Sequence, residues 1–162
     1  MYDVTIVGGG IMGSSLAWAH ITLTNVKNVL LIEKNSDLAM VNSHPLSNAE
    51  TLHDGATETN MTLPYARRMR YAAHLMATFL EKYAPNAFRK VRKMVVGIGE
   101  DEIKLLEERY REFKPYYPSL VFLRGNEIAV YEPAVMEGRK NPNEIAAILE
   151  NPIAFDSAGV IV

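Results

Sequence analysis

The chain has 162 residues, of which 48% are hydrophobic and 22% are charged, an ordinary composition for a soluble globular protein. Its 17 basic and 19 acidic side chains give a net charge of -2, so electrostatics gives no support for nucleic acid as a partner. The absence of cysteine excludes disulfides, thiolate nucleophiles and cysteine-ligated zinc. The four histidines show no H-x-x-x-H spacing, so no metal site is expected. No apolar run approaches the roughly 20 residues of a membrane-spanning helix.

The N-terminal residues predict one βαβ unit. A short β-branched run at residues 4–7 indicates a buried parallel strand that ends at Gly8. Helical spacing of apolar residues follows from residue 11 to about residue 23. A second apolar run at residues 29–32 indicates another buried strand, which Glu33 closes. The crossover between the two strands is expected to be right-handed.

The remaining residues predict further helices and strands, and the alternation favours the α/β class. Residues 35–60 are rich in Asn, Ser, Thr, Asp and His and predict a long loop, a kind of segment that is usually functional or disordered. Thr62 and Pro64 indicate the start of an amphipathic helix that ends before Pro85. The later elements are expected to be a strand at residues 95–98, a helix at 101–113, strands at 120–123 and 127–131 around a turn at Gly125-Asn126, and a short helix at 143–149.

Residues 8–13, which read Gly-Gly-Gly-Ile-Met-Gly, match the fingerprint G-x-G-x-x-G between a predicted strand and a predicted helix. In such a turn Gly8 permits the tight exit from the strand, Gly10 lets the backbone approach a pyrophosphate, and Gly13 lets the helix pack against the strand. The N–H groups at the helix N-terminus then face the phosphates. Glu33 follows Gly13 by 20 residues and can accept hydrogen bonds from ribose hydroxyls.

The fingerprint leaves alternatives open. A structural glycine turn followed by a solvated glutamate at a strand end would look similar. The pattern also does not separate NAD from FAD, because both cofactors bind to it. Glu33 disfavours NADP, because an acidic side chain at this position opposes a 2′-phosphate.

Four stretches of the sequence carry a more specific resemblance. They are residues 2–13 with Ala17, Glu33-Lys34, residues 47–55 with 58–62, and residues 127–128 and 131–133 with 146–149. Together they resemble the D-amino-acid-oxidase-like superfamily of FAD-dependent oxidoreductases. Within it, the nearest branch is that of malate:quinone oxidoreductases and 2-hydroxy-acid dehydrogenases. The third stretch, Ser-Asn-Ala-Glu-Thr-Leu-His-Asp-Gly and then Glu-Thr-Asn-Met-Thr, is the most specific.

The resemblance implies an α/β fold with a Rossmann-like FAD-binding βαβ unit of the glutathione-reductase type, incomplete in this chain, and the start of an α+β substrate domain. It implies four parts: the βαβ unit and flavin-contacting loop at residues 1–62, a helical segment of the FAD domain at 63–94, the beginning of the substrate or cap domain at 95–150, and a truncated return to the FAD domain at 151–162. The chain is expected to match about the first third of a relative, with the remainder on the same polypeptide or on a second chain.

The activity implied by the resemblance is FAD-dependent oxidation of a 2-hydroxy acid such as malate or 2-hydroxyglutarate, with electrons passed to quinone or another acceptor. The chain alone is expected to be inactive, because the base and the carboxylate-binding residue of such enzymes usually lie later in the chain. A cytoplasmic location is expected, with peripheral attachment to the inner face of the membrane as an alternative. Other hypotheses are a non-catalytic remnant, an NAD-binding module or an FAD-dependent amino-acid oxidase.

The resemblance also assigns candidate site residues. His53 is the catalytic candidate, for contact with the isoalloxazine ring or for proton transfer, and its alternative is a loop histidine that bonds to the backbone. Ser47, Asn48 and Thr51 offer short polar groups to the cofactor, with the alternative that they satisfy the loop's own backbone. The cofactor-binding candidates are Gly8, Gly10, Ile11, Met12, Gly13, Glu33, Lys34, Ser47, Asn48 and Thr51.

Overall fold

The computed structural model describes residues 1–151 and the backbone of residues 159–161, in two compact units, Met1–Glu50 and Thr51–Val162. The four-part division expected from the resemblance stays a prediction. Its last part, residues 151–162, falls mostly outside the described residues. No helix of the described segments is long and apolar enough to cross a bilayer.

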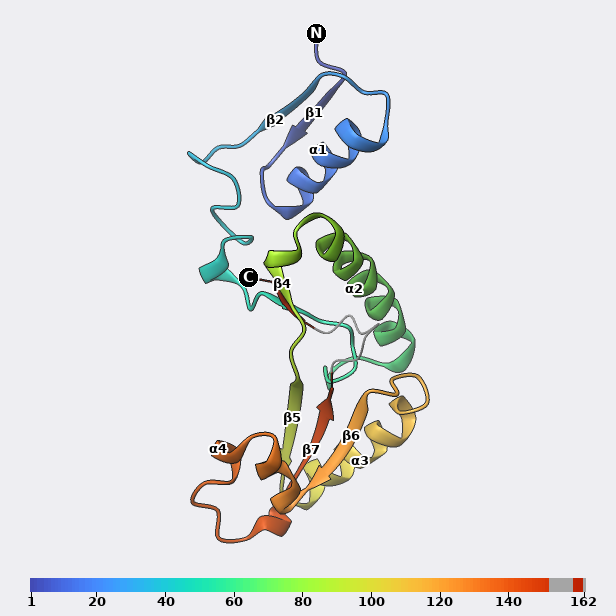
Figure 1. The fold of residues 1–162 in the computed structure, drawn as a ribbon, viewed down its shortest axis with the longest axis vertical. Helices are drawn as coiled ribbons and strands as arrows, with labels where there is room; N and C mark the ends of the chain where they lie inside the picture. Colours follow the sequence, from blue (N-terminus) through green and yellow to red (C-terminus); the bar gives the residue numbers. More distant parts are fainter. Residues whose placement is uncertain (152–158, 162) are drawn as a thin grey trace. The chain divides into compact units, whose positions relative to one another are not determined.

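The first unit is the predicted βαβ unit (Figure 1). Strand β1 (Val4–Val7) leads into helix α1 (Ile11–Leu23), and strand β2 (Val29–Ile32) follows. The two strands pair in parallel along their whole length, with Val4 opposite Val29 and Val7 opposite Ile32. The predicted strands and helix are therefore confirmed.

The expectation that both strands are buried is wrong in part. Ile6 is 6% exposed, but Val7 and Ile32 are 82% and 47% exposed. Successive side chains of a strand point to opposite faces of the sheet. A two-stranded sheet with the single helix α1 has too few layers to cover both faces, so alternate side chains remain in contact with solvent.

The predicted loop at residues 35–60 contains two short elements. A 3-10 helix, η1 (Pro45–Ser47), lies in the first unit, and strand β3 (Thr51–Leu52) begins the second. Strand β3 pairs antiparallel with β8 (Gly159–Ile161), which pairs on its other edge with β4 (Phe88–Arg89).

Helix α2 (Leu63–Tyr83) starts after Thr62 and ends before Pro85, as predicted. Because its apolar residues recur every three or four positions, one side of the helix is buried, and that side carries Ala66, Ala73, Ala77 and Leu80. A second 3-10 helix, η2 (Pro85–Ala87), connects α2 to β4.

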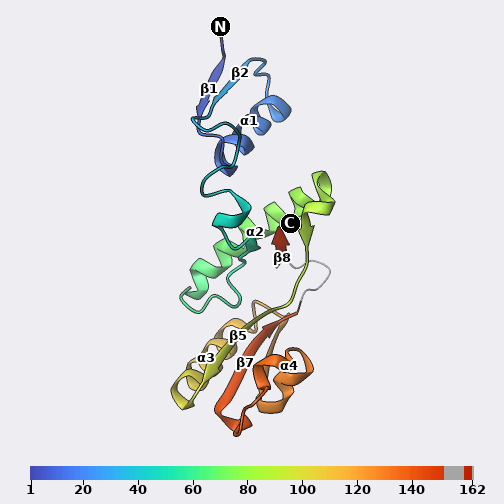
Figure 2. The same ribbon diagram turned by 90° about the vertical axis from the view of Figure 1, so that its left-hand side faces the viewer.

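A three-stranded antiparallel sheet forms the larger part of the second unit. Its order is β5-β7-β6, with β5 (Lys93–Ile98) and β6 (Leu120–Arg124) on either side of β7 (Ile145–Glu150). Helix α3 (Glu100–Phe113) covers one face of this sheet. The 3-10 helix η3 (Gly125–Val130) and the short helix α4 (Pro133–Met136) cover the other, as Figure 2 shows.

Two predictions for this unit are wrong. The helix expected at residues 143–149 is a 3-10 turn, η4 (Pro142–Glu144), followed by the central strand β7. All six residues of β7 are buried, and the first five are apolar, so the alternation that marks a half-exposed strand is missing. Of the strand expected at residues 127–131, residues 127–130 belong instead to η3, and Tyr131 caps that helix. Glu127 accepts a hydrogen bond from the backbone of Arg124 in its first turn.

Candidate functional site

The glycine turn between β1 and α1 depends on glycine for two separate reasons. Gly8 has a φ of 100°, a left-handed conformation that other residues adopt only with strain. At Gly13 a Cβ atom would overlap the carbonyl oxygen of Gly8, so the first turn of α1 packs directly on the backbone that leaves β1. These observations agree with the roles that the fingerprint assigns to the two positions.

Glu33 supports the turn from the end of β2. Its Oε2 accepts a hydrogen bond of 2.7 Å from the backbone N–H of Gly9, and its Oε1 accepts two bonds from Asn35, 2.9 Å from the backbone and 2.7 Å from the side chain. The backbone bonds from Asn35 and Gly9 lower the pKa of the Glu33 carboxyl from its usual value. The sequence predicted Glu33 as a ribose acceptor, and it missed this contact with the turn.

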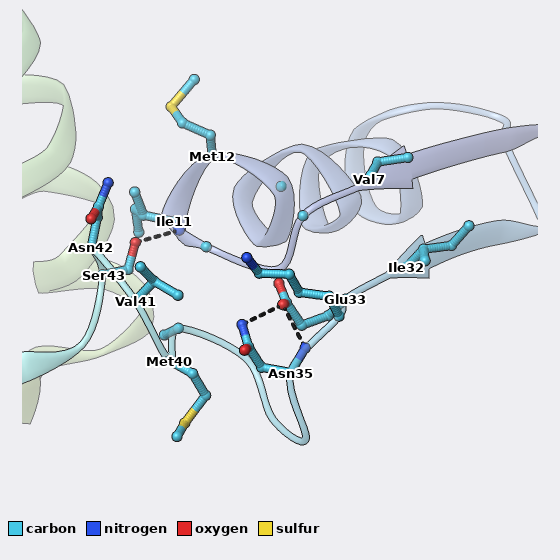
Figure 3. A pocket seen from close by; sticks show the side chains of 15 residues that line it. Val7, Ile11, Met12, Ile32, Glu33, Asn35, Met40, Val41, Asn42 and Ser43 are labelled. Atoms are coloured by element: carbon cyan, nitrogen blue, oxygen red, sulfur yellow. Dashed lines mark hydrogen bonds between the residues drawn. The ribbon is translucent and has the colours of Figure 1, made fainter.

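The loop that follows β2 returns to the N-terminus of α1. The backbone N–H of Ala39 donates to the carbonyl of Gly9 at 3.1 Å. The hydroxyl oxygen of Ser43 accepts a 3.0 Å bond from the backbone N–H of Ile11 (Figure 3). The first N–H group of α1 is therefore directed at an oxygen atom, as expected for an unpaired donor at a helix N-terminus.

A cleft of about 590 Å³ lies within the first unit between the turn and this loop. Seven predicted cofactor-binding residues line it: Gly8, Gly10, Ile11, Met12, Gly13, Glu33 and Lys34. The sequence missed the opposite wall, Asn35 and residues 39–43 (Figure 3). The sequence signal for that wall was general: it belongs to the long loop at residues 35–60, predicted to be functional or disordered, and it follows the second strand directly.

Three other predicted residues do not line the cleft. Ser47 lies in η1. The side-chain amide of Asn48 donates to the carbonyl of His44 at 2.9 Å, and its oxygen accepts from the backbone N–H of Glu50 at 2.7 Å. Asn48 thus satisfies the loop's own backbone, the alternative given for it above. Thr51 lies in β3 of the second unit, opposite Val160.

His53 also belongs to the second unit. Its side chain is 48% exposed, and its Nδ1 lies 2.7 Å from a carboxylate oxygen of Glu58. Glu58 in turn lies 3.5 Å from the ammonium of Lys93. Among the described residues, no cluster of His, Asp and Glu is placed to hold a metal ion.

Lys93 is surrounded by acidic side chains. Its ammonium lies 3.0 Å from Asp54 and 3.1 Å from Glu150, both fully buried. Burial lowers the pKa of Lys93, but the charges of Glu150, Asp54 and Glu58 raise it by more, so the net shift is upward. Burial likewise raises the pKa of Asp54, but the charge of Lys93 and the hydrogen bonds that the carboxyl group makes together lower it by more, so the net shift is downward.

Comparison with known proteins identifies the class. The model of the FAD dependent oxidoreductase (DAO) family matches residues 3–151. A probable malate:quinone oxidoreductase from Campylobacter jejuni is 36% identical over 153 residues, 91% of this chain and 34% of its own length. A malate:quinone oxidoreductase from Helicobacter pylori is 32% identical over 139 residues, 85% of this chain and 31% of its own. The chain thus spans about a third of the length of these curated relatives.

A solved structure shows the same fold. The L-amino acid deaminase from Proteus myxofaciens, in complex with anthranilate, superposes with a TM-score of 0.56 at 19% identity, over 99% of this chain and 33% of that one. On the family match, the chain belongs to the FAD-dependent oxidoreductases, and FAD is the cofactor of that family.

The first unit fits the ADP part of FAD. The first turn of any α-helix carries N–H groups without helical partners, and α1 presents these groups beside the cleft. A Cβ atom at Gly10 would stand 3.1 Å from Ser43 Oγ, so any larger residue here would press on the Ser43 side chain beside the cleft. Lys34 adds a positive charge at the cleft, and the acidic Glu33 stands at the end of β2.

Proposed function

We propose that this chain forms the ADP-binding part of an FAD-dependent dehydrogenase of 2-hydroxy acids such as malate, with quinone or another carrier as electron acceptor. The supporting observation is that similarity to malate:quinone oxidoreductases extends over 85–91% of the chain and therefore over both compact units. The glycine turn alone would indicate only that the chain binds a dinucleotide, because many protein classes use this motif.

The proposed contacts follow from the cleft. The pyrophosphate of FAD would lie at the N-terminus of α1, against Gly8, Gly10, Ile11 and Met12. Glu33 would accept hydrogen bonds from the adenosine ribose with the lone pairs that Gly9 and Asn35 leave free. When bound, FAD supplies the acceptor for the hydride that leaves the hydroxyl-bearing carbon.

Other residues would complete the site. Lys34, which lines the cleft, would contribute its charge toward the phosphates. Ser47 and Thr51 offer hydroxyls, and Asn48 would have to exchange its bonds to His44 and Glu50 for bonds to the cofactor. Transfer of electrons to a quinone would take place at a membrane surface, so we expect the working enzyme to bind membranes peripherally.

A chimaera tests the activity. The segment of the Campylobacter relative that this chain matches would be replaced by the chain, and the purified chimaera assayed for dye-coupled oxidation of malate, 2-hydroxyglutarate and a set of amino acids. We expect a yellow protein that oxidises malate or 2-hydroxyglutarate. A folded chimaera that binds FAD but oxidises only amino acids would favour the amino-acid oxidase hypothesis. A chimaera that folds without FAD would favour a remnant.

The cofactor contact has its own test in the chain itself. Gly10→Val would place a branched side chain against Ser43, where the backbone must meet the pyrophosphate. We expect this variant to lose FAD uptake, measured by quenching of flavin fluorescence on titration with the protein. Ser15→Val, an exposed position in α1, is the size-matched control and should bind normally. Normal flavin content in the Gly10 variant would remove the glycine turn from the site.

A further inference from the structure

The loop that carries His53 is anchored in the second unit by several backbone contacts. Arg109 of α3 donates to four of its carbonyls, those of Gly55 at 3.0 Å, Ala56 at 3.5 Å, Glu58 at 2.6 Å and Met61 at 3.0 Å. Residues 54–57 are buried. At Gly55, whose φ is 91°, a Cβ atom would come within 2.6 Å of Ala66, so the loop packs directly on the backbone of α2.

The anchoring continues through side chains. Tyr117 donates from its hydroxyl to the carbonyl of Asp54 at 3.1 Å, and the Asp54 carboxylate accepts from Lys93 at 3.0 Å. Lys93 begins β5 and lies opposite Glu150, the last residue of β7, in the sheet register. The positive charge that faces Glu58 is therefore fixed by the sheet and does not depend on a mobile surface side chain.

These contacts determine what His53 meets. Glu58 is mostly buried, with 14% of its side chain exposed, whereas the imidazole of His53 is about half exposed. A carboxylate can only accept hydrogen bonds, so the imidazole nitrogen 2.7 Å away must carry the proton. That nitrogen is Nδ1. The second nitrogen, Nε2, is then left with a lone pair on the exposed part of the ring.

We propose that Glu58 is a positioning residue that holds His53 in the Nδ1–H form, with Nε2 kept as the atom that takes up and releases a proton. A surface ion pair would not fix the imidazole in this way, because its partners could move independently. Here the carboxylate is held by Lys93 through its side chain and by Arg109 through its backbone. This arrangement is a carboxylate–histidine pair of the kind that sets the tautomer of an imidazole.

The use of Nε2 rests on the proposed function. In the oxidation of a 2-hydroxy acid, the hydroxyl-bearing carbon would give up a hydride, for which bound FAD would supply the acceptor, and the hydroxyl would give up its proton as this carbon becomes a ketone. The hydroxyl proton would pass to Nε2 of His53, which becomes an imidazolium. Glu58 would stabilise that cation without taking the proton.

The tautomer can be measured without cofactor or turnover. In 15N-labelled chain, two-bond correlations between imidazole nitrogens and ring protons show which nitrogen is protonated, and His53→Asn identifies the signals. We expect Nδ1–H at His53. His44 is an internal reference of the opposite form, because its Nδ1 accepts from the backbone N–H of Leu46 at 3.1 Å and its proton must lie on Nε2. An Nε2–H signal at His53 would overturn the proposal.

Variants separate positioning from folding. Glu58→Ala should release His53 from the Nδ1–H form, and Glu58→Gln, whose amide oxygen can still accept, should restore it. Glu150→Gln removes another partner of Lys93 and should leave the His53 signals unchanged. Persistence of Nδ1–H at His53 in a folded Glu58→Ala protein would contradict the positioning role of Glu58. If that variant does not fold, the tautomer of His53 in the wild-type chain tests the proposal. A chimaera that fails to oxidise 2-hydroxy acids while His53 remains Nδ1–H would overturn the proposed function but not the positioning by Glu58.

Discussion

At the scale of single residues, the spacing of the glycine turn predicts where the turn lies but not all of the contacts around it. Its spacing predicted the turn, and the structure adds a different physical reason at each glycine: a positive φ at Gly8 and backbone contact at Gly13. The sequence could not predict that a Cβ at Gly9 would overlap Leu38, or that Ser43 would face Ile11, because both contacts depend on how the loop after β2 returns to the turn.

The contact at Gly13 leads to a prediction. Gly13→Ala would force the start of α1 away from the carbonyl of Gly8, and overpacking of this kind typically costs about 1–3 kcal/mol. We expect earlier unfolding of the first unit in urea and weaker binding of FAD. Ser15→Ala, on an exposed face of the same helix, should change neither measurement. If Gly13→Ala is as stable in urea as Ser15→Ala, the start of α1 can move away from Gly8 without loss of stability.

At the scale of elements, β5 and β7 meet at a buried group of charges. Lys93 lies among Asp54, Glu58 and Glu150, and it cannot lose its charge without leaving these carboxylates unpaired. The sequence did not indicate this group, because its members lie in three segments far apart in the chain, the loop at residues 54–58, β5 and β7. It did predict α2, α3 and β5, whose apolar residues follow helical or strand periodicity. It failed for β7, whose residues 145–149 are apolar without alternation because both faces of the strand are buried.

The charges predict how stability depends on pH. The raised pKa of Lys93 contributes stability below its unfolded value of about 10.4, and this stability is lost as pH rises through the folded value. The lowered pKa of Asp54 contributes stability above its unfolded value of about 3.9, and this is lost as pH falls through the folded value. Stability of the second unit should therefore be greatest between these limits.

Removal of Lys93 should reverse how the stability of the second unit changes as pH falls, so that acid stabilises it. Lys93→Met leaves buried carboxylates without a cation, which typically costs about 3–5 kcal/mol at neutral pH, and protonation should then relieve the loss. We expect the variant to become more stable from pH 8 to pH 5, as measured by urea unfolding. Lys90→Met, which disrupts a surface pair with Glu81, should stay within about 0.5 kcal/mol of wild type. A Lys93→Met variant as stable as wild type at pH 7 would mean that pairing of Lys93 with the buried carboxylates does not stabilise the second unit.

At the scale of the whole molecule, the two units differ in how well they are buried. The sheet of the first unit leaves Val7 and Ile32 exposed, whereas the sheet of the second unit is covered on both faces. Local opening costs less where fewer apolar groups are buried. Amide hydrogen exchange followed by mass spectrometry should therefore be fastest in β1 and β2 and slowest in β7.

Addition of FAD sharpens that prediction, because a ligand stabilises the part of the protein that binds it. The cofactor should slow exchange in residues 4–43 and have a smaller effect on β5, β6 and β7. Equal protection of the two units without FAD, or slower exchange confined to the second unit on its addition, would contradict the assignment of the cleft.

The position of β7 in its sheet also has a consequence for synthesis of the protein on the ribosome. In the described sheet β5 and β6 are not neighbours, and each pairs with β7 alone. Strand β7 is made last, so the two earlier strands emerge into a cell without the partner that joins them. Until residues 145–150 leave the exit tunnel, the apolar side of α3 and both strands are open to other nascent chains and to chaperones. Translation of β7, the last strand of this sheet, is thus the step that lets β5, β6 and the apolar side of α3 become buried.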